Sequence, residues 1–392
     1  MNRKIRVAFW HNTFAPYRVP LFQQLAAFDD IDLTVYYGSE KDRHRTWTVD
    51  FGSGYSHILL PYILIPWYPH KLNYTLFSEL LRKNYDVHIA SENELGCQIA
   101  YFAARWAKKP FILWSEEIDY EIVHDRREYT FQGCIKKMFP YLGRKLHKIV
   151  FFPFYYGAIY VKRHANACLA AGQKTVEHLA GVGSKGPFFR HGSTVDTARL
   201  YRQLQQQNVS ALKRSFGIEG KKVILSVSYL QKRKGIQYLI ETFLQLNYED
   251  IVLLIVGDGE YKWELLKLVP ENRTDIVFIG HDENTAKFYA IADIFVMPSF
   301  SDPWGLTINE AMIAGLPVIT TTNVGAQELI QGNGFVIPPR DSQSLKIALE
   351  KLLSDDQLRH KLGKQSLEII KDYTIEHTAE VCRAAIHAVT KN

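Results

Sequence analysis

The sequence is poor in cysteine and has no long hydrophobic run, and each shortage excludes a class of protein. The four cysteines among 392 residues lie far apart, without the C-x-x-C spacing of a zinc knuckle or a redox pair. The longest strongly apolar run, residues 149–161, is interrupted by Pro153 and is shorter than the roughly 20 residues of a membrane-spanning helix. We therefore expect no transmembrane segment, and we expect reduced core cysteines at Cys97, Cys134, Cys168 and Cys382.

Targeting signals and repeats are missing as well. Residues 1–6 lead directly into an apolar run, without the hydrophobic region and small-residue cleavage site of a secretory signal, so a cytoplasmic location is expected. No fixed-period repeat is visible. What is present is 47% apolar residues in a chain longer than one core usually organises, which predicts two domains.

Basic residues are unevenly distributed along the chain. Residues 1–190 contain 25 Lys and Arg against 17 Asp and Glu, and the remainder contains 22 against 24, so the net charge of +6 divides into +8 and −2. Between Arg126 and Arg163 many basic and aromatic residues accompany a single acid, Glu128. Such a surface suits peripheral contact with an anionic membrane, although a solvated basic helix followed by a buried aromatic segment has the same composition. No nucleic-acid module accompanies it, so no nucleic-acid partner is expected.

Short apolar, β-branched runs alternate with helical patterns along the chain. This alternation predicts an α/β protein whose parallel strands are buried on both faces. We place the domain boundary near Asp196, which gives domains at residues 1–195 and 196–372 and a packing helix within 373–392. Strands are expected at residues 6–10, 32–37, 87–90 and 111–114 in the first domain, and at 223–227, 251–256, 276–279, 294–297, 317–320 and 334–337 in the second.

The most informative segment is residues 298–318, which reads PSFSDPWGLTINEAMIAGLPV. A strand ends there, a polar loop with Pro and Gly follows, and a helix is expected to begin near Leu306 or Thr307. The free N–H groups at such a helix start, together with the positive end of the helix dipole, can bind a diphosphate. Glu310, one turn further into the helix, offers two oxygens to a vicinal diol such as that of a ribose.

This segment resembles the C-terminal half of glycosyltransferase family 4, in which an acidic residue, seven intervening residues and a glutamate form an E-x7-E element. Asp302 and Glu310 occupy the two positions, with Asp where the family more often has Glu. The resemblance implies that Asp302 meets the donor sugar and that Glu310 meets the ribose. The alternative is a capped helix with a solvent-exposed Glu310. Further contacts with the nucleotide sugar are expected at Trp304, Gly305, Leu306 and Thr307.

A second loop supports the same resemblance. It follows a strand, precedes an expected helix over residues 236–246, and reads SVSYLQKRKG over 226–235. Lys234 matches the lysine of the family's Lys-Gly pair, and a cation there would neutralise charge on the departing nucleoside diphosphate. Tyr229 stands where the family has an Arg. Three residues are candidates for the missing cation: Arg233, Lys232 and Arg18 of the first domain.

Two weaker segments match the family as well. Gly257-Asp258-Gly259 follows a strand and resembles a V-G-D-G segment. Residues 278–281 resemble an F-x-G element near the nucleobase, which adds His281 to the substrate-binding candidates. Taken alone, a glycine after a strand usually only turns the chain.

The first half of the chain matches the family less closely. Residues 110–117 align with the segment in which many relatives place a histidine beside the reacting sugar, and Glu116 falls at that position. We take Glu116 as a catalytic candidate, with a solvent-facing carboxylate as the alternative. Asp30 and Asp32 form a D-x-D pair, which binds a divalent metal in transferases of another fold. The pair lies far from the nucleotide loops in sequence, so no metal is expected.

Taken together, the resemblance implies a GT-B fold, in which two Rossmann-like doubly wound domains face one another across a cleft. The donor would bind to the second domain and the acceptor to the first. The implied reaction is a retaining transfer of a hexose from a UDP- or GDP-sugar to a saccharide or lipid-linked acceptor, in polysaccharide or glycolipid assembly, without a cofactor. Two alternatives remain open: a nucleotide-sugar-binding protein without turnover, and a GT-B epimerase.

Overall fold

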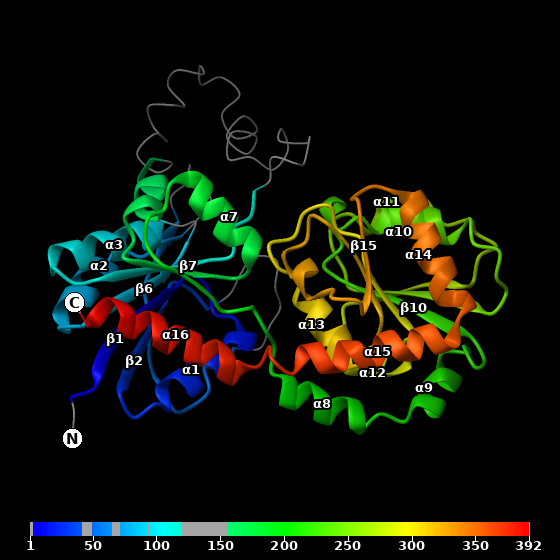
Figure 1. Ribbon diagram of the computed structural model, residues 1–392, viewed down its shortest axis with the longest axis horizontal. Coiled ribbons are helices and arrows are strands. Elements are labelled where there is room, and N and C mark those ends of the chain that lie inside the picture. Colours follow the sequence, from blue (N-terminus) through cyan, green and yellow to red (C-terminus); the bar gives the residue numbers. More distant parts are fainter. Residues whose placement is uncertain (1–2, 41–48, 65–70, 93–94, 120–155, 392) are drawn as a thin grey trace, which may run out of the picture. The chain divides into compact units, whose positions relative to one another are not determined.

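The computed structural model describes residues 3–40, 49–64, 71–92, 95–119 and 156–391. The chain forms two compact units, the first of Met1–Gly192 and Ile375–Asn392 and the second of Ser193–Thr374 (Figure 1). Each unit has its own parallel sheet, the α/β arrangement that the sequence predicts. Asp196, where the boundary was expected, caps helix α8 (Thr197–Gln205) near the start of the second unit.

Within the described residues, the sheet of the first unit has seven parallel strands in the order β3-β2-β1-β6-β7-β8-β9. The four predicted strands are confirmed, each within one residue at either end. β8 was not predicted because its sequence, Ala-Cys-Leu-Ala, has few of the β-branched and aromatic residues that favour strands. The strands are β1 (Ile5–His11), β2 (Ile31–Tyr37), β3 (Ser56–Leu59), β6 (Val87–Ser91), β7 (Phe111–Ser115), β8 (Ala167–Ala170) and β9 (Phe188–Arg190).

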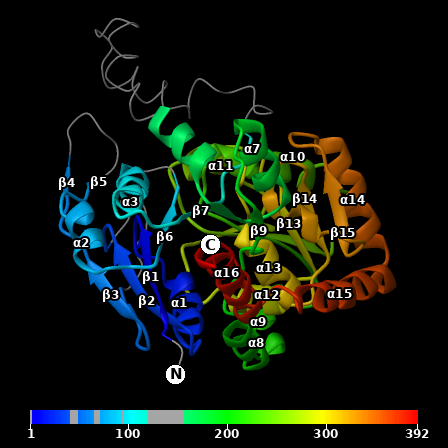
Figure 2. The ribbon, with the colours of Figure 1, turned by 60° about the vertical axis from the view of Figure 1, so that its left-hand side comes forward.

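Alternate residues of β1 fill two separate cores on the two faces of this sheet. Val7 and Phe9 pack with helices α1 (Val19–Ala26) and α16 (Ile375–Thr390), whereas Ala8 and Trp10 pack with α2 (Leu76–Arg82) and α3 (Leu95–Trp106) (Figure 2). Both faces of the sheet are therefore covered, as in a doubly wound domain. The remaining described elements are η1 (Pro16–Arg18), β4 (Ile63–Leu64), β5 (Lys71–Leu72), the helical residues 156–164 and α7 (Gln173–Val182).

Helix α16, the terminal packing helix, belongs to the first unit. Cys382 and Ile386 are fully buried in the core that α16 shares with α1. Arg383 Nε and His387 Nε2 lie 3.1 Å and 2.6 Å from carboxylate oxygens of Asp30. Burial acts to raise the pKa of Asp30, but the hydrogen bonds with His387 and Arg383 lower it overall. The first residue of the D-x-D pair thus has a structural partner in α16.

The cysteines that the structure describes are buried, and none of them forms a disulfide with another described cysteine. Cys97 lies in α3 and Cys168 in β8, both in the core on one face of the sheet, and Cys382 lies in α16 in the core on the other face. Burial raises the pKa of the Cys168 thiol to about 11. The prediction of reduced core cysteines is confirmed for these three, and Cys134 lies outside the described residues.

The second unit contains a parallel sheet in the order β12-β11-β10-β13-β14-β15. All six predicted strands are confirmed within one residue. They could be predicted because short β-branched runs, bounded by Gly, Pro or charge, are typical of parallel strands buried on both faces. Their bounds are β10 (Lys222–Val227), β11 (Ile251–Val256), β12 (Ile276–Gly280), β13 (Ile294–Met297), β14 (Val318–Thr321) and β15 (Gly334–Ile337).

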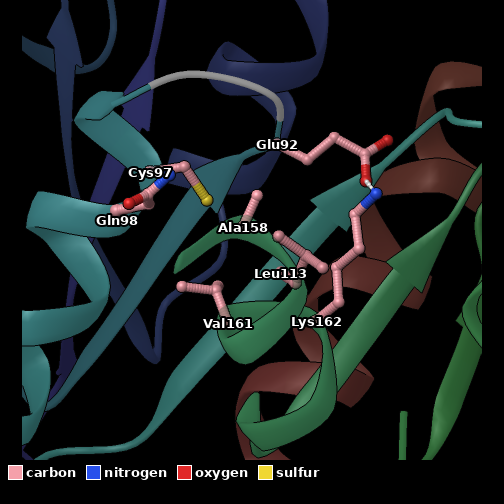
Figure 3. A pocket seen from close by; sticks show the side chains of 7 residues that line it. All are labelled: Glu92, Cys97, Gln98, Leu113, Ala158, Val161 and Lys162. Atoms are coloured by element: carbon pink, nitrogen blue, oxygen red, sulfur yellow. Dashed lines mark ion pairs between the residues drawn. The ribbon is translucent and has the colours of Figure 1, made fainter. Parts of the chain in front are cut away.

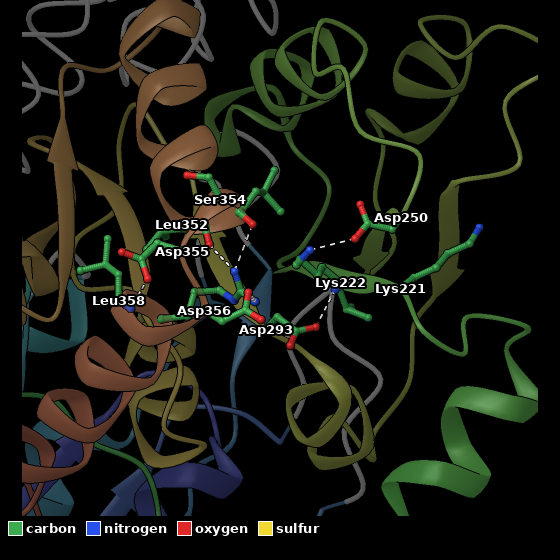
Figure 4. Close-up of polar contacts among 12 residues, drawn as sticks. Lys221, Lys222, Asp250, Asp293, Leu352, Ser354, Asp355, Asp356 and Leu358 are labelled. Carbon is green, nitrogen blue, oxygen red and sulfur yellow. Dashed lines mark hydrogen bonds and ion pairs between the residues drawn. The ribbon is translucent and has the colours of Figure 1, made fainter.

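Ion pairs and side-chain hydrogen bonds lie at the amino ends of these strands (Figure 4). Lys222 Nζ lies 2.8 Å from Asp250, and the Asp293 carboxylate accepts the backbone N–H of Val223 at 2.8 Å. The opposite edge, at the carboxyl ends of the strands, carries the loops that hold Lys234 and Asp302. The helices of this unit are α8, α9 (Val209–Ser215), η2 (Lys232–Lys234), α10 (Ile236–Phe243), α11 (Lys262–Leu266), α12 (Ala286–Ile291), α13 (Leu306–Ile313), η3 (Gly325–Leu329), α14 (Ser342–Ser354) and α15 (Asp356–Ile370).

Candidate active site

The two motif loops of the second unit meet where the strand order reverses. β11 and β12 lie on one side of β10 and β13 to β15 lie on the other, and ligands of doubly wound sheets bind at the carboxyl ends of the strands at such a point. The loop after β10 carries Lys234, and the loop after β13 carries Asp302. The two loops are also joined by a backbone hydrogen bond of 3.0 Å from Phe300 N to Arg233 O.

Lys234 and Asp302 form an ion pair at this meeting point. Lys234 Nζ donates to Asp302 Oδ2, and the two side chains are only 13% and 9% exposed. Arg233 Nη1 lies 3.6 Å from the same oxygen and donates to the Ser301 carbonyl at 2.8 Å. Burial acts to raise the pKa of Asp302, but Lys234 and then Arg233 hold it below its usual value. The structure therefore brings together three of the predicted site residues, with Asp302 ionised.

Helix α13 begins at Leu306, as the motif predicts. Gly305 occupies the N-cap in the left-handed conformation, with φ of 103°. A Cβ atom at this position would lie 2.9 Å from Met297 Sδ, so glycine permits both the turn and the close approach to β13. The first amides of the helix, at Leu306 and Thr307, lie at the positive end of its dipole. This end can receive a phosphate group.

Glu310 lies one turn inside α13 and is half-buried rather than solvent-exposed. The hydroxyl of Tyr289, in α12, donates to Glu310 Oε2 at 2.6 Å. Burial raises the pKa of Glu310 to about 7, although the Tyr289 hydrogen bond acts to lower it. No spacing signal links a tyrosine in one helix with a glutamate in the next, and the sequence therefore did not reveal Tyr289.

The Trp304 side chain is part of the interior of the second unit. It is 3% exposed, and its indole N–H donates to Asn309 Oδ1 at 3.0 Å. Asn309 Nδ2 in turn donates to the Ser193 carbonyl at 3.1 Å. Trp304 was expected to contact substrate. Since its ring has a structural role, only its backbone remains for such a contact.

The loops after β11 and β12 lie side by side on the other flank of β10. Gly257 N donates to Gly280 O at 2.8 Å, and Leu230 N donates to Asp258 O at 2.9 Å. A Cβ atom on Gly257 would lie 1.8 Å from the Ser228 carbonyl, so glycine is required there for packing. His281 follows Gly280 and is exposed, and Tyr229, at the position of the family's Arg, is 37% exposed.

In the first unit, Glu116 and Arg18 form an ion pair in which Arg18 is buried and Glu116 is 35% exposed. Arg18 Nη2 donates to Glu116 Oε1, and the Arg18 guanidinium lies 4.5 Å from the centre of the Trp114 ring. Burial acts to raise the pKa of Glu116, but Arg18 lowers it overall. Arg18 was one of three candidates to replace the Arg missing at Tyr229. The structure gives it a partner within its own unit.

A second group of charges in the first unit was not predicted (Figure 3). Lys162 donates to Glu117 and lies 3.9 Å from Glu92, and His178 Nε2 lies 3.6 Å from Glu117. Lys162 had been counted in the basic stretch that suits a membrane, but it is only 7% exposed, which corrects that assignment for this residue. The rest of that stretch up to residue 155 lies outside the described residues.

The fold places the chain among GT-B proteins. The crystal structure of Anabaena Alr3699/HepE in complex with UDP and glucose has a TM-score of 0.73 and 17% identity, over 98% of this chain and 100% of that chain. WaaG, a glycosyltransferase involved in lipopolysaccharide biosynthesis, has a TM-score of 0.69 and 18% identity, over 98% and 100%. At such low identity, these likenesses show the fold alone.

The sequence comparisons match the second half of the chain to a glycosyltransferase family. Residues 208–368 match the family described as glycosyl transferases group 1. The N-acetyl-alpha-D-glucosaminyl L-malate synthase of Bacillus anthracis is 29% identical over 171 residues, which is 42% of this chain and 45% of that protein. The alpha-monoglucosyldiacylglycerol synthase of Streptococcus pneumoniae is 32% identical over 185 residues, 45% of this chain and 42% of that protein. The chain thus spans about half the length of the curated relatives it matches. The part of the second unit over residues 208–368 is thus similar to the group 1 glycosyltransferases, the type that its motifs resemble.

Proposed function

We propose that this protein is a retaining hexosyltransferase that uses a nucleoside-diphosphate sugar and a hydroxyl acceptor in polysaccharide or glycolipid assembly. The observation that carries the proposal is the buried Lys234–Asp302 pair at the reversal of strand order, beside the start of α13. This arrangement combines a fixed cation, an ionised acceptor of sugar hydroxyls and a helix N-terminus for phosphate. A site that held only a structural ion pair would have no use for the helix N-terminus.

In this proposal, each site residue of the second unit contacts a different part of the donor. Lys234 neutralises the charge that grows on the diphosphate as the glycosidic bond breaks, and the amides of Leu306 and Thr307 hold that group. Asp302 accepts hydrogen bonds from the hexose. Glu310, ionised, accepts both hydroxyls of the ribose, with Tyr289 fixing one of its oxygens.

The residues of the first unit are assigned to the acceptor side. Glu116, paired with Arg18, stands at the carboxyl end of β7 where its carboxylate can meet a polar reactant. In the family, the leaving phosphate is described as taking the acceptor proton. On that mechanism Glu116 orients the reacting groups and need not act as a nucleophile.

Relatives support a UDP- or GDP-hexose without choosing between them. The HepE structures are described as complexes with UDP, with UDP and glucose, and with UDP-glucose. A GDP-mannose-dependent phosphatidylinositol monomannoside mannosyltransferase of Corynebacterium glutamicum is 31% identical over 205 residues, 49% of this chain and 54% of that protein. The acceptor in the name of this mannosyltransferase is a lipid, and a saccharide or lipid-linked acceptor is proposed here.

Peripheral contact with an anionic membrane on the cytoplasmic side is part of the proposal for a lipid-linked acceptor. It rests on the composition of residues 126–163, of which 126–155 lie outside the described residues. In the part of the chain that the structure describes, no helix is long and apolar enough to cross a bilayer.

The proposal is tested by thermal-shift measurements with UDP, GDP and ADP, followed by assays of sugar transfer and hydrolysis. A nucleotide at 100 times its Kd stabilises the folded protein by about 2.7 kcal/mol, which raises the melting temperature. We expect UDP or GDP to do so, and the matching sugar nucleotide to be turned over. Stabilisation without any turnover would instead favour a nucleotide-sugar-binding protein, and no stabilisation by any nucleotide would contradict the proposal.

A further inference from the structure

Glu92 has an unusual set of partners at the carboxyl end of β6. Its Oε1 atom accepts two backbone N–H groups from the end of the neighbouring strand, Glu116 N at 2.8 Å and Glu117 N at 2.7 Å. The Glu92 side chain is only 7% exposed. One carboxylate oxygen therefore fixes two successive peptide groups just after β7.

The two residues fixed in this way direct their carboxylates to different partners. Glu116 pairs with Arg18 of η1, whereas Glu117 pairs with Lys162 and lies 3.6 Å from His178 of α7. Successive side chains of an extended segment point in opposite directions, so the backbone position decides which carboxylate reaches which partner. A rotation of this segment would exchange or lose both pairings.

Substrate cannot reach Glu92 through the space beside it. The cavity next to its side chain, about 10 Å³ in volume, has room for roughly one water molecule (Figure 3). Its lining is partly apolar, including Leu113, Ala158 and Val161. Within the described residues, Glu92 is therefore placed to act through the residues that it holds.

We infer that Glu92 is a positioning residue, which fixes the backbone at Glu116 and Glu117 so that the Glu116 carboxylate is presented with Arg18 on the acceptor side. The inference rests on the proposed function, since it assigns Glu92 to the support of a residue proposed to act there. It also assigns Glu117 to the interior, as the anchor of Lys162 and His178, and leaves Glu116 as the carboxylate available to a reactant.

The bonds that Glu92 accepts require an oxygen but not a charge. Burial, and then the Glu117 carboxylate, raise the pKa of Glu92, so its charge is already disfavoured. Glu92→Gln keeps a carbonyl oxygen of the same reach, whereas Glu92→Ala removes it. Glu92→Met fills the space without providing an acceptor. It replaces the alanine variant in these measurements if that variant does not fold.

Amide hydrogen exchange tests the role of Glu92 directly, without any substrate. In Glu92→Ala or Glu92→Met, exchange at Glu116 and Glu117 should accelerate by about tenfold or more, because both N–H groups lose their acceptor. Glu92→Gln should stay within about twofold of the wild type, as should Glu79→Gln, a matched change on α2. Unchanged exchange in both non-acceptor variants, or equal acceleration in Glu92→Gln, would overturn the inference.

Hydrolysis of UDP-glucose and GDP-mannose supplies the functional readout. We expect the non-acceptor variants to lower kcat by about 10- to 100-fold with little change in the donor KM, because the donor binds to the other unit. Glu92→Gln should restore kcat. Equal kcat in all variants would overturn the role in the reaction. Absence of hydrolysis in the wild type would count against the proposed function, while the exchange result would still decide whether Glu92 holds the segment.

Discussion

The Lys234 ammonium group is held against Asp302 in the second unit, and both side chains are largely buried. Its proposed task concerns charge that increases toward the transition state, so its removal should affect turnover more than ground-state binding. Lys234→Ala should lower kcat by about 100-fold or more, with a smaller loss of nucleotide affinity. Steady-state kinetics and calorimetry measure the two losses, with Lys361→Ala, an exposed lysine of α15, as the control. Equal losses in both quantities would contradict the assignment.

Glu310 is expected to make nucleotide binding depend on pH. Burial raises the pKa of this carboxyl to about 7, and the ionised form is the one that accepts two ribose hydroxyls. Affinity should therefore weaken as the pH falls through about 7. Glu310→Ala should weaken binding by at least roughly tenfold at pH 8 and remove the pH dependence. Calorimetric titration of the nucleotide at several pH values checks this, and an unchanged profile in the variant would exclude Glu310 as its origin.

At the scale of single residues, the sequence predicted the residues that belong to motifs. It did not predict the residues that contact or position them. Lys234, Asp302 and Glu310 could be selected because each stands at a fixed place in a strand-loop-helix pattern. Tyr289 and Glu92 could not, because their partners come from other segments and no spacing rule links them. For the same reason Arg18 was only one of three candidates for the missing cation, and its contact with Glu116 was not predicted.

The loop between β10 and α10 depends on a glycine. Gly235 has φ of 72°, and a Cβ atom there would lie 2.1 Å from the Pro298 carbonyl. In Gly235→Ala the added Cβ atom would push apart the loops that carry Lys234 and Asp302. Nucleotide affinity should therefore fall sharply.

Gly220→Ala provides the matched control for this prediction. Gly220 has nearly the same φ, 73°, but open space where the Cβ atom would lie. The Gly220 variant should lose about 1–2 kcal/mol from the left-handed conformation alone. The Gly235 variant should lose at least about 1 kcal/mol more from the clash. Denaturant unfolding measures both, and equal losses would mean that the close approach to Pro298 is unimportant.

Strands and helices were predicted best where both faces are buried. The six strands of the second unit carry β-branched residues, and their limits agree within one residue. β8, with Ala-Cys-Leu-Ala, and β9, with three residues, lack that signal and were not predicted. Helix α13 began where its motif predicted, since Gly305 both ends the loop and permits the turn.

At the scale of the whole molecule, a lipid-linked acceptor would require contact with a membrane. Each basic residue near an anionic surface adds about 1 kcal/mol of binding. Replacement of Lys136, Lys137, Arg144 and Lys145 by Ser should therefore nearly abolish co-sedimentation with anionic vesicles and leave donor hydrolysis intact. Lys162 is omitted because it is buried. Equal sedimentation of the wild type with anionic and neutral vesicles, or none with either, would favour a soluble saccharide acceptor.

The central claim is that a nucleoside-diphosphate sugar binds to the second unit at Lys234, Asp302 and Glu310. The most direct measurement is a crystal structure of the protein with UDP or GDP, chosen by the larger thermal shift. We predict the diphosphate at the amides of Leu306 and Thr307 within reach of Lys234, and the ribose hydroxyls on Glu310. A nucleotide bound elsewhere, with the Lys234–Asp302 pair and Glu310 untouched, would contradict the account.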